Sequence, residues 1–151
     1  MPLFIGEYLY TIDEKGRVNI PARFRKATAE HADNTYIISQ GRDKCLYIYP
    51  MDIYEKKIVE MMDKLSEADP LHRAFMSLQG AKATDASLDK QGRITIPPKF
   101  VEFAGIQKDV QIIGAFNRIE VWDPKIRENY LHELDSSGID LEEKISLELS
   151  Q

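Results

Sequence analysis

Apolar and polar residues alternate over short stretches of this chain, and these stretches predict many β-strands. Short runs that alternate or are continuously apolar are typical of strands buried on one or both faces. The pattern predicts strands at residues 8–12, 17–20, 35–39, 45–49, 110–113 and 118–122. Asp and Gly within residues 13–16 favour a tight turn, so the first two strands are expected to form a hairpin. A second hairpin is expected near residues 86–96.

Apolar residues spaced three and four apart predict helices between and after these strands. The expected helices span residues 22–29, 53–66, 98–104, 125–134 and 141–149, with fraying as the alternative for the last, and one more begins at Pro70 and ends before Gly80. Asp52 and Asp123 are the expected N-cap residues of two helices, because their carboxylates can accept hydrogen bonds from the first turn. We interpret the apolar stripes of the helices as surfaces that pack in the core or between subunits.

The chain contains an internal repeat. Six residues recur with a constant offset of 76: Asp13, Gly16, Arg17, Ile20, Pro21 and Phe24 reappear as Asp89, Gly92, Arg93, Ile96, Pro97 and Phe100. Two copies are too few for a solenoid, so the repeat predicts a duplicated domain with pseudo-two-fold symmetry. The expected parts are a first module at residues 7–54, a helical connection at 55–82, a second module at 83–126 and a helical acidic tail at 127–151.

The distribution of charge is more informative than the net charge of −5. Residues 133–151 contain six acids and one Lys, so this tail accounts for the whole excess. Residues 13–26 carry a local charge of +3, and residues 89–99 carry +2. Positive charge is therefore concentrated in the repeated segments, where it suits an anionic partner such as DNA.

Composition argues against several classes of protein. Hydrophobic residues make up 43% of the chain and charged residues 30%, which is ordinary for a globular protein. No apolar run approaches the length of a membrane span, and the N-terminus lacks the pattern of a signal peptide, so a cytoplasmic protein is expected. Cys45 is the single cysteine. A single cysteine excludes an internal disulfide and a multi-cysteine metal site. We expect the Cys45 side chain to be buried.

The repeated residues resemble a known family of regulators. The string from Asp13 to Arg25 is similar to the swapped-hairpin module of AbrB and SpoVT regulators. Its duplication, with residues 73–76 between the copies and 116–122 near the end, resembles the MraZ family. Two extra residues before the usual start and the acidic tail depart from the family pattern, and neither affects the motifs.

This resemblance implies an α+β, mainly β fold, in which two swapped-hairpin β-barrel half-modules complete each other within one chain. It also implies a ring-shaped homo-oligomer, associated with the nucleoid. Such a regulator would bind double-stranded DNA at promoter direct repeats of the division and cell-wall gene cluster, including its own promoter, and act as a repressor.

A two-stranded ribbon fits the major groove of DNA, which suggests a role for each repeated side chain. We assign base recognition to Arg17 and Arg93, because arginine can donate two hydrogen bonds to guanine. The basic residues expected to contact phosphates are Lys15, Lys90, Arg23, Arg25 and Lys99. The residues expected to fix the turns or to orient the arginines are Asp13, Gly16, Asp89 and Gly92. The alternative is that the Asp–Arg pairs are only salt bridges on a solvated surface.

Other classes of protein fit the sequence less well. His31, His72 and His132 are scattered, and no Walker, GxSxG or HExxH motif occurs. We therefore expect no enzyme activity, no cofactor and no metal site. An antitoxin-like or other protein-binding module, whose acidic tail would hold a toxin, is the main alternative, although such chains usually carry one module. A purely structural ring is a further alternative, and the basic turns in both copies argue against it.

Overall fold

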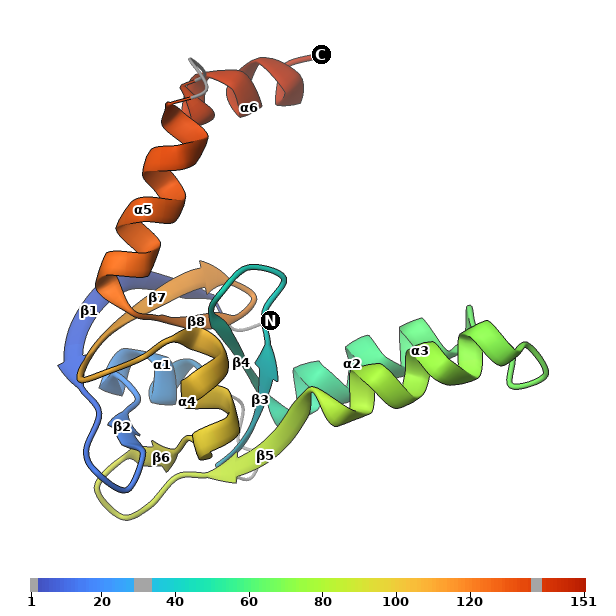
Figure 1. The fold of residues 1–151 in the computed structure, drawn as a ribbon, viewed down its shortest axis with the longest axis horizontal. Coiled ribbons are helices and arrows are strands. Elements are labelled where there is room, and N and C mark those ends of the chain that lie inside the picture. Colours follow the sequence, from blue (N-terminus) through green and yellow to red (C-terminus); the bar gives the residue numbers. More distant parts are fainter. Residues whose placement is uncertain (1–2, 29–33, 137–139) are drawn as a thin grey trace.

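The computed structural model describes residues 3–28, 34–136 and 140–151 (Figure 1). Its strands are β1 (Phe4–Thr11), β2 (Arg17–Asn19), β3 (Thr35–Gln40), β4 (Leu46–Pro50), β5 (Ala83–Ser87), β6 (Arg93–Thr95), β7 (Asp109–Phe116) and β8 (Ile119–Trp122). Its helices are α1 (Ala22–Ala27), α2 (Met51–Met62), α3 (Pro70–Ala81), α4 (Pro98–Ala104), α5 (Pro124–Asp135) and α6 (Leu141–Leu149). The expected α+β class is confirmed, whereas the expectation of a mainly β fold is wrong, because the helices contain more residues than the strands.

Strands from the two copies join in one antiparallel sheet. The six-stranded sheet has the order β1-β7-β8-β4-β3-β5, and β2 and β6 form a separate pair. The ladders β1–β7, β4–β8 and β3–β5 each connect the two halves of the chain. Among the described strands, β1 and β5 remain as edges, so the large sheet does not close into a barrel. The module boundaries expected from the sequence stay a prediction.

The predicted hairpin between residues 8–12 and 17–20 is wrong. Its turn forms, but the two strands then separate: β1 continues beside β7, and β2 pairs with β6. The hairpin predicted near residues 86–96 separates in the same way, because β5 pairs with β3. An isolated two-stranded hairpin buries too little apolar surface to be stable, whereas pairing across the copies builds a larger structure. Local turn chemistry therefore predicts the turn but not the partner of each strand.

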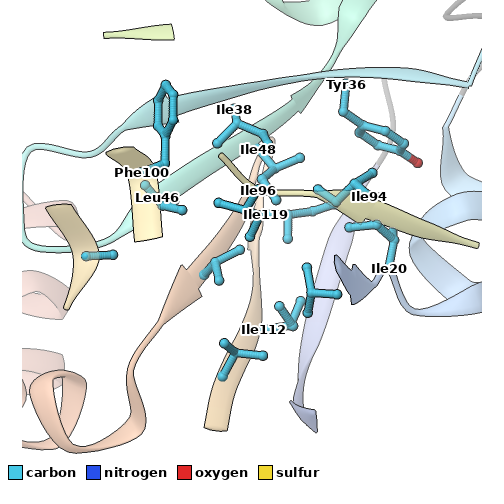
Figure 2. Packing of buried hydrophobic residues seen from close by; sticks show 14 of the residues in the cluster. Ile20, Tyr36, Ile38, Leu46, Ile48, Ile94, Ile96, Phe100, Ile112 and Ile119 are labelled. Carbon is cyan, nitrogen blue, oxygen red and sulfur yellow. The ribbon is translucent and has the colours of Figure 1, made fainter. Parts of the chain in front are cut away.

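Both copies contribute to one hydrophobic core (Figure 2). Val18 and Ile94 face each other in the β2–β6 ladder, and each is 1% exposed. Figure 2 shows Ile20 beside Ile94. Other buried members from both halves are Tyr36, Ile38, Leu46, Ile48, Val110, Ile112, Ile119 and Val121. Burying a large apolar side chain contributes about 1.5–3 kcal/mol, so separating the halves would lose much of the stabilisation.

Most helix boundaries follow the sequence. The predicted end of the second helix at residue 66 is wrong, because α2 ends at Met62. Asp123 is the N-cap of α5, as expected. The N-cap predicted at Asp52 is wrong, because Pro50 ends β4 and leads directly into α2, which places Asp52 in the first turn. α3 continues through Gly80, because a single glycine weakens a helix without ending it. α1 ends at Ala27, and the predicted end at residue 29 lies outside the described residues.

Two helical arms extend from the core (Figure 1). α2 and α3 project together to one side, while α5 leads away from the sheet to α6. These four helices contain no buried residue. The exposed large apolar side chains on them are Val59, Met62, Leu71, Phe75, Leu78, Leu131, Leu134, Leu141, Ile145, Leu147 and Leu149. The core does not cover these faces, so packing between subunits stays the prediction for them.

Within the described ranges, no helix is both long enough and apolar enough to cross a lipid bilayer.

Candidate nucleic-acid interface

A hydrogen-bonded turn joins β1 to β2, and the Asp13 side chain closes it. Asp13 Oδ1 accepts from the backbone N–H of Lys15 at 3.0 Å and from that of Arg17 at 2.8 Å. Asp13 Oδ2 accepts from Arg17 Nε at 2.6 Å. Gly16 completes the turn with a φ of 80°, a left-handed conformation that favours glycine. One carboxylate thus holds both the backbone and the guanidinium of the same arginine.

The second copy repeats this turn between β5 and β6. Asp89 Oδ1 accepts from the backbone N–H of Gln91 at 2.8 Å and from that of Arg93 at 2.9 Å. Asp89 Oδ2 accepts from Arg93 Nε at 2.9 Å, and Gly92 has a φ of 77°. The residues between Asp and Gly differ in the two copies. The shared geometry therefore follows from the Asp, Gly and Arg that recur.

The two turns lie side by side because the copies are hydrogen-bonded to each other at this point (Figure 1). The backbone N–H of Ile20 donates to the Gly92 carbonyl at 3.0 Å. The backbone N–H of Ile96 donates to the Gly16 carbonyl at 2.7 Å. This reciprocal pair flanks the β2–β6 ladder, so each turn is supported by the strand that follows the other turn.

The Asp and Arg side chains form one charged cluster at the joined turns. Arg93 Nη1 lies 4.0 Å from Asp13 Oδ2, across the boundary between the copies. The hydrogen bond from the Arg17 backbone lowers the pKa of Asp13, and the guanidinium of Arg17 lowers it further. The Arg93 backbone and guanidinium lower the pKa of Asp89 in the same way. Both carboxylates are thus ionised at neutral pH.

The two arginines are held and yet accessible. The side chain of Arg17 is 34% exposed, and that of Arg93 is 25% exposed. Each Nε donates to a carboxylate, while a guanidinium carries four further N–H donors on its two Nη atoms. The arrangement can therefore present fixed donors to an external acceptor.

The other basic residues predicted at the site occupy unequal positions. Lys15 and Lys90 are exposed within the two turns. Arg25 donates from Nε to the Ile20 carbonyl at 3.1 Å. Its guanidinium also covers Gly92, since a Cβ added to that glycine would lie 2.7 Å from Arg25 Cζ. The structure thus brings Lys15, Lys90 and Arg25 to the joined turns.

Arg23 and Lys99 occupy matching positions on α1 and α4. Arg23 is exposed on its helix. Lys99 Nζ donates to the Ala81 carbonyl at 2.8 Å, at the C-terminal end of α3, where the helix dipole favours a cation. Lys99 also lies 5.9 Å from the centre of the Phe100 ring. The structure therefore places Lys99 against α3, not within either turn.

A polar cluster beside β4 and β8 was missed by the sequence reasoning. The Arg118 guanidinium lies 3.9 Å from the centre of the Tyr47 ring, and Arg118 Nη2 lies 2.7 Å from Glu120 Oε2. Trp122 Nε1 donates to Glu120 Oε1 at 2.9 Å. The available signal was the spacing of two residues between Arg118, Glu120 and Trp122, which places Glu120 and Trp122 on one face of β8 and Arg118 just before that strand.

The site chemistry differs from that of a metal centre or a reactive thiol. In the parts of the chain that the structure describes, no three His, Cys, Asp or Glu side chains are grouped to hold a metal. Cys45 is buried, as expected, and burial raises the pKa of its thiol to about 12. Because the thiolate is the reactive form, burial of the Cys45 side chain disfavours its reactivity at neutral pH.

Comparison with known sequences decides the family. The family profile described as "MraZ protein, putative antitoxin-like" matches residues 3–78 and 80–146. The chain belongs to the MraZ family. The resemblance noted in the repeated motif is therefore confirmed.

Several MraZ relatives match over nearly their whole length, and each is named "Transcriptional regulator MraZ". The protein from Natranaerobius thermophilus is 37% identical over 146 residues, which cover 95% of this chain and 96% of the relative. The protein from Desulfitobacterium hafniense is 39% identical over 135 residues, which cover 89% of this chain and 91% of the relative. The protein from Acetivibrio thermocellus is 37% identical over 145 residues, which cover 96% of this chain and 98% of the relative. These MraZ proteins are named as regulators and not as enzymes, in agreement with the expectation of no enzyme activity.

Proposed function

We propose that this chain is a sequence-specific DNA-binding transcription regulator whose joined turns enter the major groove. The observation that carries the proposal is the pair of Asp-held arginines, Arg17 and Arg93, brought together by the β2–β6 pairing. The names of the relatives support a role in transcription. The geometry supports DNA as the partner, because two-stranded β-ribbons fit the major groove.

Arg17 and Arg93 read base edges in this proposal. Each donates from its Nη atoms to O6 and N7 of a guanine, the commonest specific contact in the major groove. The bond from Nε to the carboxylate holds the guanidinium before DNA arrives, so less side-chain entropy is lost on binding. Asp13 and Asp89 therefore act as orienting residues, and their negative charge keeps them away from phosphates.

The remaining basic residues contact phosphates, which add affinity but little sequence information. Lys15 and Lys90 flank the arginines and make the main contacts. Arg23 and Arg25 make further phosphate contacts from α1. Lys99 makes the smallest contribution, because it has to leave the Ala81 carbonyl to reach a phosphate.

Several copies act together in this proposal. One pair of turns offers few contacts, and linking several of them raises the effective concentration at neighbouring sites. We therefore propose a ring-shaped homo-oligomer that binds direct repeats in the promoter of the division and cell-wall gene cluster, including its own promoter, and acts there as a repressor.

The test measures binding of labelled DNA that carries the repeats upstream of the protein's own gene, over a series of salt concentrations. Arg17→Ala and Arg93→Ala should each weaken specific binding by about tenfold or more, as expected for loss of a bidentate base contact. Arg17→Lys keeps the charge, so it should lose sequence preference with an unchanged salt slope. Lys15→Ala should weaken binding to all sequences and reduce the log–log salt slope by about 0.9 per subunit.

Arg127→Ala on α5 is the matched control, since it removes one guanidinium far along the chain from both turns. It should bind the repeats as the wild type does. Unchanged specific affinity in both Arg17→Ala and Arg93→Ala would disprove the assignment of base recognition.

A further inference from the structure

A large groove lies between the α2–α3 arm and the sheet, away from the joined turns. Its volume is about 790 Å³. Four cationic residues line it: Arg42, Lys57, Lys82 and Arg118. Apolar side chains such as Met61 and Phe75 form part of its wall, and no Asp or Glu is among its described lining residues. The groove therefore suits an occupant that is both acidic and apolar.

Among the described residues, three of these four cations have no carboxylate within ion-pair distance. Arg118 is paired with Glu120 at 2.7 Å, so its charge is largely compensated. Lys57 Nζ lies 3.4 Å from the Tyr49 hydroxyl and 5.2 Å from the centre of that ring, which are contacts that leave its charge in place. Arg42 and Lys82 are exposed. The groove thus has an excess of positive charge close to its apolar wall.

The acidic tail has complementary properties. α6 places Leu141, Ile145 and Leu149 four residues apart on one helix face, and these side chains are 46%, 40% and 81% exposed. Six acids and one Lys accompany them in residues 133–151. An acidic helix with an uncovered apolar face is the kind of segment that docks in a groove lined by cations and apolar side chains.

The groove and the α6 helix of the same chain lie apart. Within one chain, α5 carries α6 away from the sheet and from the α2–α3 arm (Figure 1). We propose that α6 of one copy docks in the groove of a neighbouring copy, with its acids facing Arg42, Lys57 and Lys82 and its apolar face against Met61 and Phe75. Tail and groove are different surfaces, so the contact is heterologous and propagates from copy to copy until a ring closes.

This contact deepens the part of the proposed function that concerns assembly, and it is independent of base recognition. The test therefore measures self-association without DNA, by sedimentation velocity of the full chain over a range of concentrations. Loss of the contact would leave the Arg17 and Arg93 assignment untouched, and loss of that assignment would leave the contact untouched.

Charge reversal on each side gives the decisive variants. The tail variant carries Glu142→Lys, Glu143→Lys and Glu148→Lys. The groove variant carries Arg42→Glu, Lys57→Glu and Lys82→Glu. The control variant carries Lys56→Glu, Lys64→Glu and Lys125→Glu, the same change of charge as the groove variant at residues outside the groove lining.

The tail variant and the groove variant should each associate about tenfold more weakly than the wild type, because like charges then face each other. An equimolar mixture of the two should recover association, since each reversed tail meets a reversed groove. The control should stay close to the wild type. Wild-type association of either variant alone, or no recovery in the mixture, would overturn the proposal.

A disulfide between copies provides a second measurement that does not depend on charge. Lys82→Cys and Leu147→Cys in one chain should form inter-chain disulfides under copper–phenanthroline oxidation in air, which removes one hydrogen from each thiol. Cys45 does not interfere, because it is buried. The pair Lys56→Cys and Leu147→Cys is the control and should stay monomeric on a denaturing gel. Equal crosslinking of the two pairs would overturn the placement of α6.

Discussion

The turns of the two copies share a sequence motif and a hydrogen-bond pattern, but different groups support them. A Cβ added at Gly16 would collide with the backbone oxygen of Ile96. A Cβ added at Gly92 would meet the guanidinium of Arg25 instead, 2.7 Å from its Cζ. The first turn is thus backed by rigid main chain, and the second by a movable side chain. A duplicated motif can therefore keep its own geometry while its supports diverge.

Arg25 has no counterpart in the second copy. The residue 76 positions later is Val101, which is partly buried and packs against the core. The two copies therefore differ at α1 and α4, which breaks the pseudo-two-fold symmetry. The two ends of the pair of turns are thus not equivalent, and the pair has a direction. A direct repeat also has a direction, whereas a palindrome has not, so the asymmetry suits the direct repeats proposed as the target.

The largest expected effect is a loss of stability that differs between the two repeated phenylalanines, Phe24 and Phe100. Phe24 is fully buried and makes edge contacts with Phe4 and Tyr8, with ring centres 5.4 Å apart in each pair. Phe100 is 4% exposed. Phe24→Ala should destabilise the protein by about 3–5 kcal/mol, and Phe100→Ala by about 1 kcal/mol less, because aromatic pairs add to the effect of burial.

Urea unfolding at a fixed protein concentration measures this difference, since association would otherwise shift the apparent stability. Phe75→Ala, on the exposed arm, should cost clearly less than either substitution. Equal losses at positions 24 and 100 would show that the aromatic contacts of α1 add nothing.

The next largest effect is the difference in stability between alanine substitutions at the two turn glycines, Gly16 and Gly92. Both have positive φ, so alanine costs about 1–2 kcal/mol at either position. Gly16→Ala should cost about 1–3 kcal/mol more than Gly92→Ala, because the Ile96 backbone cannot move aside as the Arg25 side chain can. Unfolding of both variants checks the order, and a larger loss at Gly92 would contradict it.

Arg25→Val, which gives the first copy the residue type of the second, should have a smaller effect. Loss of the hydrogen bond to the Ile20 carbonyl should cost about 1 kcal/mol. In the Gly92→Ala background the loss should shrink, because the side chain that blocks the new methyl group is gone. A double-mutant cycle measures this coupling, and Arg23→Val on the same helix is the control, expected within about 0.5 kcal/mol.

The smallest expected effect concerns the two carboxylates and is specific to acid pH. Their pKa values are lowered from 3.8 in the folded protein, mainly by the backbone N–H of Arg17 for Asp13 and of Arg93 for Asp89. Their ionised form therefore stabilises the fold fully above the unfolded pKa, and this contribution is lost as pH falls through the lowered folded pKa. Asp13→Asn and Asp89→Asn should each flatten the decline of stability below about pH 4.

Carboxyl carbon NMR titration can resolve which arginine acts on which carboxylate. Arg17→Ala should raise the pKa of Asp13. Arg93→Ala should raise the pKa of Asp89 and, by less, that of Asp13, because Arg93 Nη1 is 4.0 Å from Asp13 Oδ2. If Arg93→Ala left the pKa of Asp13 unchanged, the two Asp–Arg pairs would have no electrostatic interaction with each other.

The features that the sequence predicts best are those held by local interactions. The Asp–Gly–Arg turns, the N-cap at Asp123 and the helix α6 all depend on groups a few residues apart, and each lies where it was predicted. The base-recognition role of Arg17 and Arg93 stays a prediction, although the structure brings both into one cluster.

The tertiary structure decided which distant groups meet. The partners of β1 and β2, the position of Arg25 over the other copy's turn, and the stacking of Arg118 on Tyr47 depend on contacts between residues far apart in the chain. Hydrophobic pattern specifies that a strand is buried but not against which strand, because many pairings bury the same side chains. By itself, the sequence determined two turns. Only the tertiary structure, through the β2–β6 pairing and the shared core, determined that they stand together.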